Sequence, residues 1–364
     1  MTVKDIVAEI EKLAPPSYQE SYDNTGLIVG NPEAVASSAL LCFDVTEEVI
    51  DEAIEKRANL VISHHPAIFG GGLKKINGRN ATERIVIKAI KNDIAIYAAH
   101  TNLDSVHGGI NTVLAEKLGL SEIRILSPVK NRLFKIVTFV PEAYSERVRQ
   151  AMFDAGAGHT GNYDSCSYNI KGTGTFRGGE NTSPFVGEKG VLCNEPEIRI
   201  ETVAKKENLN GIISALKTAH PYEEPVYDVY QLENMYENAG TGAIGVLPEY
   251  TDAAEFLARI KKILSVKVIR HNDLYKKVKT VAVCGGSGSG YINEAIAAGA
   301  DVFITGDCKY HQFMDCRNEI ILVDTGHFES EYFATEIFFS LINKNFPNFA
   351  ADLSRGIFNP VQYF

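Results

Sequence analysis

Short apolar runs alternate along the first third of the chain with stretches in which apolar residues recur every three or four positions. The short runs cover residues 39–45, 59–63 and 94–99, and the helical periodicity covers residues 47–58 and 81–92. A period of two or an unbroken short run is typical of strands, and a period near 3.6 is typical of helices. Strands separated by helices of this length are expected to be parallel and joined by helical crossovers. The pattern therefore predicts an α/β fold.

The chain is also expected to begin with a helix. Thr2 is followed three residues later by Asp5, a capping arrangement, and Ile6, Val7, Ile10 and Leu13 form one apolar stripe. Pro15 and Pro16 then end the helix, because proline cannot donate a backbone hydrogen bond.

The last third repeats this rhythm. Strands are expected at residues 278–286, 300–307 and 319–326, with helices at 291–300 and 309–315, and a long helix beginning near His327. Residues 49–65 resemble residues 291–307 in their helix, Ala-containing turn and polar strand end. Residues 94–104 and 320–331 are also alike, since each is a strand followed by a histidine and then an acid. We infer two related α/β halves that form one main domain.

The middle of the chain breaks the rhythm. Residues 128–235 predict the order strand, helix, strand, strand, helix, strand, which is the ferredoxin-like βαββαβ pattern. The predicted organisation is a first half of the main domain (1–127), an inserted domain (128–235) and a second half (236–364). Turns are expected at both joins, near Ser127-Pro128 and over 234–242, where turn-forming residues gather.

Composition narrows the class of protein. A formal net charge of −10 disfavours nucleic acid as a partner, since a phosphate backbone attracts clustered Lys and Arg. The six cysteines include no C-x-x-C pair, which favours free thiols in a reducing compartment over a disulfide framework. The N-terminus lacks the apolar centre of a signal peptide, and no apolar run is long enough to cross a bilayer. We therefore expect a cytoplasmic protein without a membrane partner.

Four polar clusters fall at the expected carboxyl ends of strands, where open α/β sheets build their sites. They are His64 with His65, His100 with Asp104, Asp307 with His311, and His327 with Glu331. In a helix, the four-residue spacing of His327 and Glu331 places both on one face. His64 and His65 would point to opposite sides of a regular strand, but the chain turns at Pro66, so both could face one cleft.

A single histidine is usually a surface or hydrogen-bonded residue, and His107, His159, His220 and His271 are assigned to that class. The gathering of several His and acid clusters at one edge is what indicates a metal site. His and carboxylate donors suit zinc, iron, manganese, nickel or cobalt.

Two further motifs have alternative interpretations. The glycine-rich segment 285–290 could hold a phosphate with its backbone N–H groups, or could be a flexible turn, since it matches neither the P-loop nor the dinucleotide fingerprint. Asp23 and Asn24 could orient a ligand histidine or the substrate, or could serve only the local turn.

Taken together, several motifs resemble the family of GTP cyclohydrolase 1 type 2 homologues, also called Nif-three-like proteins. They are YDNTGLIVG (22–30), ISHHP (62–66), AAHTNLD (98–104), TGDCKYH (305–311) and DTGHFESE (324–331). The middle of the chain, with residues 155–166 and 219–229, looks like the PII/CutA-type module of the longer bacterial members.

The resemblance implies two divalent metal ions per chain, zinc, iron or manganese, held by His64, His65, Asp104, His327 and Glu331. It implies one ion on His65 and Asp104, the other on His64 and His327, and Glu331 as the bridge, but leaves open which of the adjacent histidines serves which ion. It also leaves His100 open as a ligand or as a residue that orients one. A ring-shaped homohexamer is implied as well.

The leading hypothesis is a metal-dependent hydrolase of a nucleotide-like small molecule. Two metals within bridging distance lower the pKa of a bound water and stabilise charge on the attacked group. With Glu331 occupied as a bridge, His100, Asp307 and His311 are the candidate proton carriers. The alternative is a metal-binding regulatory or adaptor protein whose inserted domain senses a ligand or partner, since fold alone does not decide function.

Overall fold

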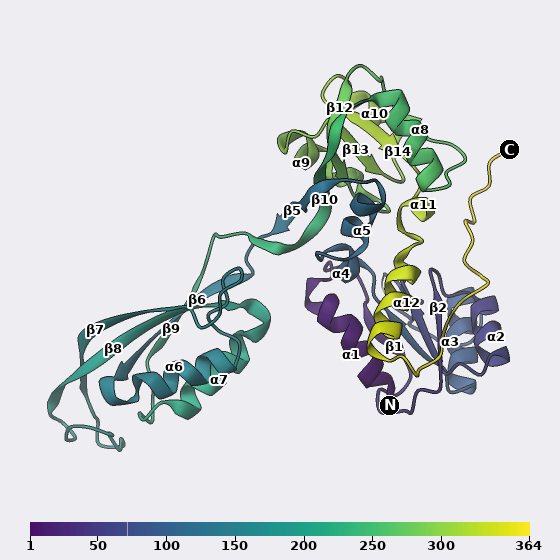
Figure 1. The fold of residues 1–364 in the computed structure, drawn as a ribbon. Coiled ribbons are helices and arrows are strands. Elements are labelled where there is room, and N and C mark those ends of the chain that lie inside the picture. The colour runs from purple at the N-terminus through teal and green to yellow at the C-terminus, as the bar shows by residue number, and fades with distance from the viewer. Residues whose placement is uncertain (71) are drawn as a thin grey trace. The chain divides into compact units, whose positions relative to one another are not determined.

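The computed structural model describes residues 1–70 and 72–364, which form two compact units. The first unit combines Met1–Pro128 with Glu237–Phe364, and the second is Val129–Tyr236 (Figure 1). The two ends of the chain therefore fold together, although the second unit separates them in the sequence. Several sheets and helices alternate, which confirms the α/β class. Within the described ranges, no helix combines the length and apolarity needed to cross a membrane.

A five-stranded sheet forms one half of the first unit. Its order is β1 (Gly26–Val29), β4 (Ala95–Ala98), β3 (Leu60–Ser63), β2 (Ala39–Cys42) and β15 (Ala351–Leu353). Strands β15, β2, β3 and β4 are parallel, and β1 is antiparallel to β4. Every residue of β2, β3 and β4 is buried, as expected of parallel strands that are covered on both faces.

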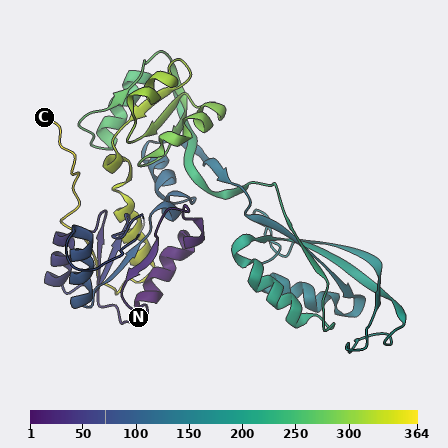
Figure 2. The same cartoon turned by 180° about the vertical axis from the view of Figure 1, so that it is seen from behind.

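Helices cover both faces of this sheet (Figures 1 and 2). Side chains of β2 alternate between the faces, because successive residues of a strand point to opposite sides. Leu40 and Cys42 pack with α2 (Glu47–Glu55) and α3 (Ala81–Lys91). Leu41 packs on the opposite face with α1 (Val3–Leu13) and α12 (Ala334–Asn345).

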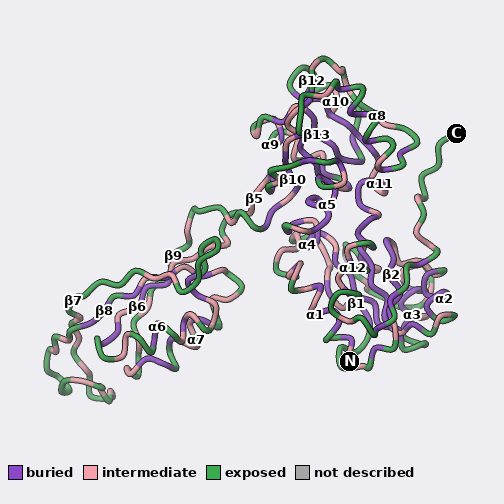
Figure 3. Tube along the Cα trace, in the orientation of Figure 1, coloured by how far each residue is buried: buried purple, intermediate pink, exposed green. Residues whose placement is uncertain are grey.

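A six-stranded sheet forms the other half. Its order is β11 (Arg270–His271), β14 (Ile321–Asp324), β13 (Val302–Thr305), β12 (Lys277–Val283), β10 (Tyr236–Asp252) and β5 (Ser121–Val129). Strands β12, β13 and β14 are parallel. One face packs with α9 (Ile292–Ala297) and α10 (Tyr310–Asp315), and the other with α8 (Ala253–Ile263). A single hydrophobic cluster includes Leu41 of the first sheet and Val281 of the second, and the buried positions follow both sheets in Figure 3.

The turns expected at the two joins are wrong. Ser127 and Pro128 lie inside β5, and residues 236–242 lie inside β10. The glycines of this region serve close strand packing instead of a turn. A Cβ on Gly240 would lie 2.2 Å from the carbonyl oxygen of Ser127, so only glycine fits there.

The long helix expected from His327 is also wrong in its extent. A short helix α11 (His327–Glu331) ends before Tyr332 and Phe333, and α12 begins at Ala334. Phe333 is fully buried in the cluster that contacts both sheets, which fixes the chain where the two helices meet.

The second unit has one four-stranded antiparallel sheet. Its order is β7 (Ser167–Arg177), β8 (Leu192–Lys205), β6 (Leu133–Pro141) and β9 (Tyr227–Gln231). Helix α6 (Ser145–Asp154) follows β6, and α7 (Leu209–Ala219) follows β8. Both helices pack on the same buried cluster as Ile136, Ile198 and Ile200 of the sheet.

Candidate metal centre

Histidines and carboxylates from both sheets of the first unit meet at the ends of parallel strands. His64 and His65 directly follow β3, and Asp104 closes the short helix α4 (Thr101–Asp104) after β4. His327 and Glu331 are the first and last residues of α11, which follows β14. The strand-end placement expected from the sequence is what brings these residues together.

The donor atoms form two adjoining groups that share Glu331, and His64, His65 and His100 make a third group. His64, Asp104 and Glu331 make one group, and His65, His327 and Glu331 make the other, with ligand atoms within 4.8 Å of one another in each. Oε2 of Glu331 lies 3.6 Å from Nε2 of His64, 3.6 Å from Nε2 of His65 and 3.1 Å from Nε2 of His327. His64 is therefore grouped with Asp104 and His65 with His327, the opposite pairing to the one first implied by the resemblance, which had left the order of the two histidines open.

Three of these donor atoms are buried and lack a hydrogen-bond partner among the described residues. They are Nε2 of His64, Oδ1 of Asp104 and Oε2 of Glu331. Leaving a buried polar atom unpaired costs about 1–3 kcal/mol, and more when the group is charged. A cation held between these atoms would satisfy all three, so the residues fit a metal ion. Their nitrogen and oxygen donors are those that divalent transition metals bind.

The opposite ring nitrogen of each histidine is held by an oxygen. Nδ1 of His64 donates to the carbonyl oxygen of Ala99 (2.9 Å), Nδ1 of His65 to Oδ1 of Asp44 (2.8 Å), and Nδ1 of His327 to Oδ2 of Asp307 (2.7 Å). Such partners fix the tautomer and the ring orientation of a metal ligand. All three Nε2 atoms therefore face the shared carboxylate.

The pKa values of His64, His65 and His327 shift in different directions. Burial lowers the pKa of His64 to about 4, so this ring is neutral and its Nε2 has a free lone pair. Burial also opposes the charge of His65, but the carboxylates of Asp44 and Glu331 raise its pKa to about 10. Burial is likewise outweighed at His327, where Glu331 and Asp307 raise the pKa to about 9.

The two central carboxyl groups shift in opposite directions. Burial, reinforced by the charge of Glu331, raises the pKa of Asp104 well above its usual value. Burial would do the same to Glu331, but the surrounding rings of His327, His64 and His65 hold its pKa well below the usual value. Without an ion, Glu331 is therefore the main negative charge of the cluster.

His100 lies against the cluster from a third direction. Its ring centroid is 5.2 Å from that of His64 and 5.1 Å from that of His65. Nδ1 of His100 donates to Oδ1 of Asp23 at 2.8 Å, which leaves Nε2 as the reactive nitrogen. Burial opposes the ionisation of Asp23, but hydrogen bonds from His100 and Thr101 lower its pKa to about 2. Of the pair weighed in the sequence, Asp23 orients a histidine, while Asn24 donates to the carbonyl oxygen of Ile68.

The glycine-rich segment 285–290 packs against Glu331. A Cβ on Gly286 would lie 2.2 Å from Oε1 of Glu331, and a Cβ on Gly285 would lie 2.9 Å from its Cγ. The N–H groups of Gly285, Gly286 and Gly288 already donate to Asn111, Ser330 and Thr305. These donors are therefore not free to hold a phosphate, and the glycines provide space beside the shared carboxylate.

The other two candidate proton carriers lie differently. Asp307 accepts hydrogen bonds from His327 and from Ser287 (2.6 Å), so it touches the cluster through a ligand. His311 is exposed on α10, stacks edge-on with Tyr310 and belongs to neither donor group. Asp44 is not among the residues predicted from the sequence, where its only signal is its position two residues after β2.

Two cavities open beside the cluster. The smaller, of about 430 Å³, is lined by Tyr22, Phe69 and His100 and by donor residues of both groups that share Glu331. The larger, of about 510 Å³, is lined by Asp44, His65, Arg270 and Tyr363. Tyr22 and Phe69 are exposed by 61% and 55% and lie edge to face at 6.4 Å, so apolar ring surface faces solvent at the mouth of the smaller cavity. A small ligand can therefore reach the cluster.

Known proteins resemble this chain in sequence and fold. The family model for Duf34/NIF3 (NGG1p interacting factor 3) matches residues 1–359. The chain belongs to this family. It is 43% identical over 325 residues to the GTP cyclohydrolase 1 type 2 homolog of Halalkalibacterium halodurans, covering 88% of this chain and 87% of that protein. The protein of the same name from Bacillus subtilis is 40% identical and covers 89% and 88%.

A solved structure of this family resembles the chain over its full length. The Bacillus cereus protein related to NIF3 has a TM-score of 0.82 and 40% sequence identity, and the match covers 100% of this chain and 99% of that one. This agreement supports the α/β architecture of the chain.

Proposed function

We propose that the protein is a dinuclear metal-dependent hydrolase of a nucleotide-like small molecule. The observation that carries the proposal is the pair of donor groups joined at Glu331, with three buried donor atoms that lack a partner among the described residues. One ion would be held by His64, Asp104 and Glu331, and the other by His65, His327 and Glu331. Two ions that share a carboxylate lower the pKa of a bound water and stabilise negative charge on the attacked group.

The surrounding residues would have distinct roles. His100 would accept a proton at Nε2, since Asp23 holds its Nδ1–H. Asp307 would act as a positioning residue through Nδ1 of His327, and His311, which is exposed and outside both donor groups, would have no part.

The substrate would be a planar heterocycle carrying a polar or anionic group. Exposed ring surface on Tyr22 and Phe69 supports stacking of a heterocycle beside His100, with ring centroids of Phe69 and His100 5.8 Å apart. The names of the curated relatives, GTP cyclohydrolase 1 type 2 homolog, make guanine nucleotides the first compounds to try.

The test is a hydrolysis screen of metal-reconstituted protein against nucleotides, beginning with GTP. Release of phosphate and the change in purine absorbance would be followed in parallel, because they report different bonds. His100→Gln should lower turnover by about 100-fold or more, as expected for loss of a general base. His311→Gln is the matched control and should retain wild-type turnover. Equal turnover in the wild-type protein and His100→Gln would contradict the role of His100.

The adaptor alternative is supported by a separate cavity in Val129–Tyr236. Metal-reconstituted protein that hydrolyses no compound of the screen, but binds a small molecule within this unit, would favour the adaptor.

We further propose that residues 128–235 are an inserted ferredoxin-like domain of the PII/CutA type. The element order β6-α6-β7-β8-α7-β9 and the sheet order β7-β8-β6-β9 support it. The family resemblance supports a homohexamer, which light scattering of the full chain would test.

A further inference from the structure

A cavity of about 570 Å³ is lined only by residues of the second unit, none of which belongs to the metal centre. Helices α6 and α7 pack on the face of the sheet that carries Ile198 and Ile200. Glu197 and Arg199 alternate with these residues in β8, so they belong to the opposite face, where they line the cavity with Phe139. The volume is in the range of small-molecule sites.

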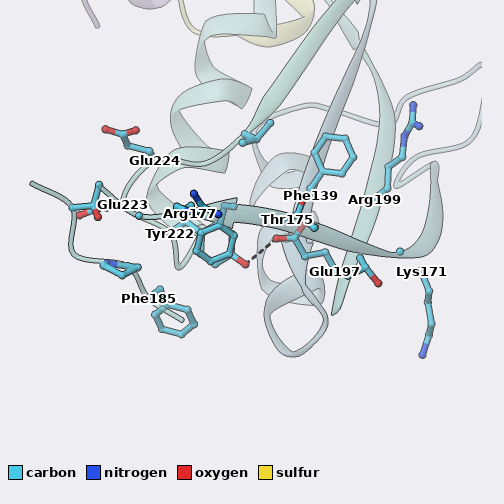
Figure 4. A pocket seen from close by; sticks show the side chains of 18 of the residues that line it. Phe139, Lys171, Thr175, Arg177, Phe185, Glu197, Arg199, Tyr222, Glu223 and Glu224 are labelled. Atoms are coloured by element: carbon cyan, nitrogen blue, oxygen red, sulfur yellow. Dashed lines mark hydrogen bonds between the residues drawn. The ribbon is translucent and has the colours of Figure 1, made fainter. Parts of the chain in front are cut away.

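Aromatic rings, among them Phe185 and Tyr222, line this cavity (Figure 4). The ring centroid of Tyr222 lies 5.9 Å from that of Phe176 and 6.3 Å from that of Phe185. Phe185 also packs edge-on against Tyr144, with ring centroids 5.3 Å apart. The rings of Phe176, Phe185 and Tyr222 come from β7, the β7–β8 connection and the segment after α7, and a fourth lining ring, Phe139, comes from β6.

A nearly buried carboxylate lies beside the rings. Glu197 is 8% exposed, and its Oε1 accepts a hydrogen bond from the hydroxyl of Tyr222 at 2.8 Å (Figure 4). Its Oε2 faces the backbone of Gly174 in the neighbouring strand β7. A Cβ on Gly174 would lie 2.1 Å from this oxygen, so the absence of a side chain there leaves room for the carboxylate. A neutral hydroxyl stabilises a nearly buried carboxylate less than a cation would, because charge-assisted hydrogen bonds are the stronger ones.

His220 positions the backbone of Tyr222. His220 is buried, with Nε2 donating to the carbonyl oxygen of Phe139 (2.9 Å) and Nδ1 accepting from the backbone N–H of Tyr222 (3.1 Å). Both ring nitrogens are therefore used, which is consistent with a neutral ring whose pKa burial lowers. The segment after α7, which resembled a PII/CutA-type motif in the sequence, thus has the local task of presenting Tyr222 to Glu197.

Three cationic and three anionic side chains line the cavity. They are Lys171, Arg177 and Arg199 against Glu197, Glu223 and Glu224. Lys171 pairs with Glu142 and Arg199 pairs with Glu201, and neither of these acids lines the cavity. Glu201 also pairs with Lys135. Two of the three lining cations thus have anionic partners outside the cavity, whereas Glu197 is held by the Tyr222 hydroxyl.

We propose that this cavity binds a small organic cation, with an ammonium or amidinium group at Glu197 and an apolar body between the rings of Phe176, Phe185 and Tyr222. The cation would compensate the buried carboxylate at Oε2, and aromatic faces attract cations through their ring quadrupoles. The proposal does not depend on the metal centre, because no residue is shared between the two sites.

The test uses the full chain and three ligands of the same shape. Benzylamine, benzyl alcohol and benzoate carry a positive, a neutral and a negative group on the same ring. Saturation-transfer NMR with the full-length protein should give the lowest Kd for benzylamine. Glu197→Gln, which keeps an acceptor for the Tyr222 hydroxyl, should weaken benzylamine by about tenfold or more, equivalent to about 1.4 kcal/mol. Glu188→Gln removes the same charge from a residue that does not line the cavity, and should bind as the wild type does.

Tyr222→Leu is a second variant. It removes one of the aromatic rings that line the cavity and should also weaken the binding of benzylamine. Unfolding temperatures of all variants establish that they are folded. Benzyl alcohol or benzoate binding as tightly as benzylamine would overturn the proposal. So would an absence of benzylamine binding, or equal affinity in Glu197→Gln and Glu188→Gln.

Discussion

Nε2 of His327 lies 3.1 Å from Oε2 of Glu331, four residues later in α11. The spacing alone places the two side chains on one helical face. The same Glu331 oxygen also faces His64 and His65 of the other half of the main unit. A single carboxylate thereby joins donors that are more than 260 positions apart in the sequence, as the His327–His65 separation of 262 illustrates.

Replacement of Gly286 by alanine should disturb this carboxylate. Gly286 has φ +58°, and a Cβ would lie 2.2 Å from Oε1 of Glu331, so the carboxylate would have to move. We expect Gly286→Ala to lose bound metal, measured by elemental analysis after reconstitution. Gly290→Ala is the control from the same segment, because nothing lies within 4 Å of its Cβ position. Equal metal content in the two variants would mean that the position of Glu331 does not control binding.

Asp307→Asn should lower the affinity for one of the two proposed ions, the one held by His327. The Asp307 carboxylate accepts from Nδ1 of His327, and loss of such a partner typically costs ten- to 100-fold in metal affinity. The affinity would be measured by competition with a chromophoric chelator. The exposed His311 supplies the control, since His311→Gln should leave both affinities unchanged. If Asp307→Asn binds both ions as the wild type does, the hydrogen bond does not position His327.

Glu52 should make stability depend on pH at acid values. This buried carboxylate accepts hydrogen bonds from Oγ of Ser354 (2.7 Å) and the backbone N–H of Arg355 (2.9 Å). Burial opposes its ionisation, but these bonds and Lys56 lower its pKa below the ordinary value of 4.5. Its contribution is therefore full above about pH 4.5 and is lost as the pH falls through the lower, folded-state pKa.

Glu52→Gln should accordingly lower the free energy of unfolding by about 1–3 kcal/mol at neutral pH, with a smaller difference from the wild type in acid. Denaturant unfolding at several pH values measures this. Glu55→Gln, which removes only an exposed pair with Arg355, should change stability much less. A Glu52→Gln difference that stays constant down to low pH would contradict the assigned cause.

Much of the main fold follows from local patterns. The Thr2–Asp5 capping box is present, Thr46 caps α2, and β2, β3 and β4 are parallel as predicted. These features depend on residues close in sequence or on the run length of buried strands, which is why a single sequence is enough to predict them.

The features that the sequence did not predict depend on tertiary contacts. The reversed grouping of His64 and His65 arises because the chain turns after β3, and no local pattern says which ring faces Asp104. Asp44 takes part only because β2 and β3 are neighbours, and the break between α11 and α12 coincides with the buried ring of Phe333. The sequence predicts a turn at Gly240 and Gly242, but the structure places both in a strand packed closely against β5. Close strand packing and turns both favour glycine, so the sequence alone does not distinguish them.

Elemental analysis of untagged protein, purified without chelators and then reconstituted, tests the central claim most directly. The wild-type protein should hold about two divalent transition-metal ions per chain. Asp104→Asn should lower the affinity for the ion that His64 also binds. Glu331→Gln should lose both ions, because both donor groups use the Glu331 carboxylate. Wild-type protein that remains metal-free with added zinc, iron or manganese, or Glu331→Gln that retains two ions, would contradict the shared-carboxylate centre.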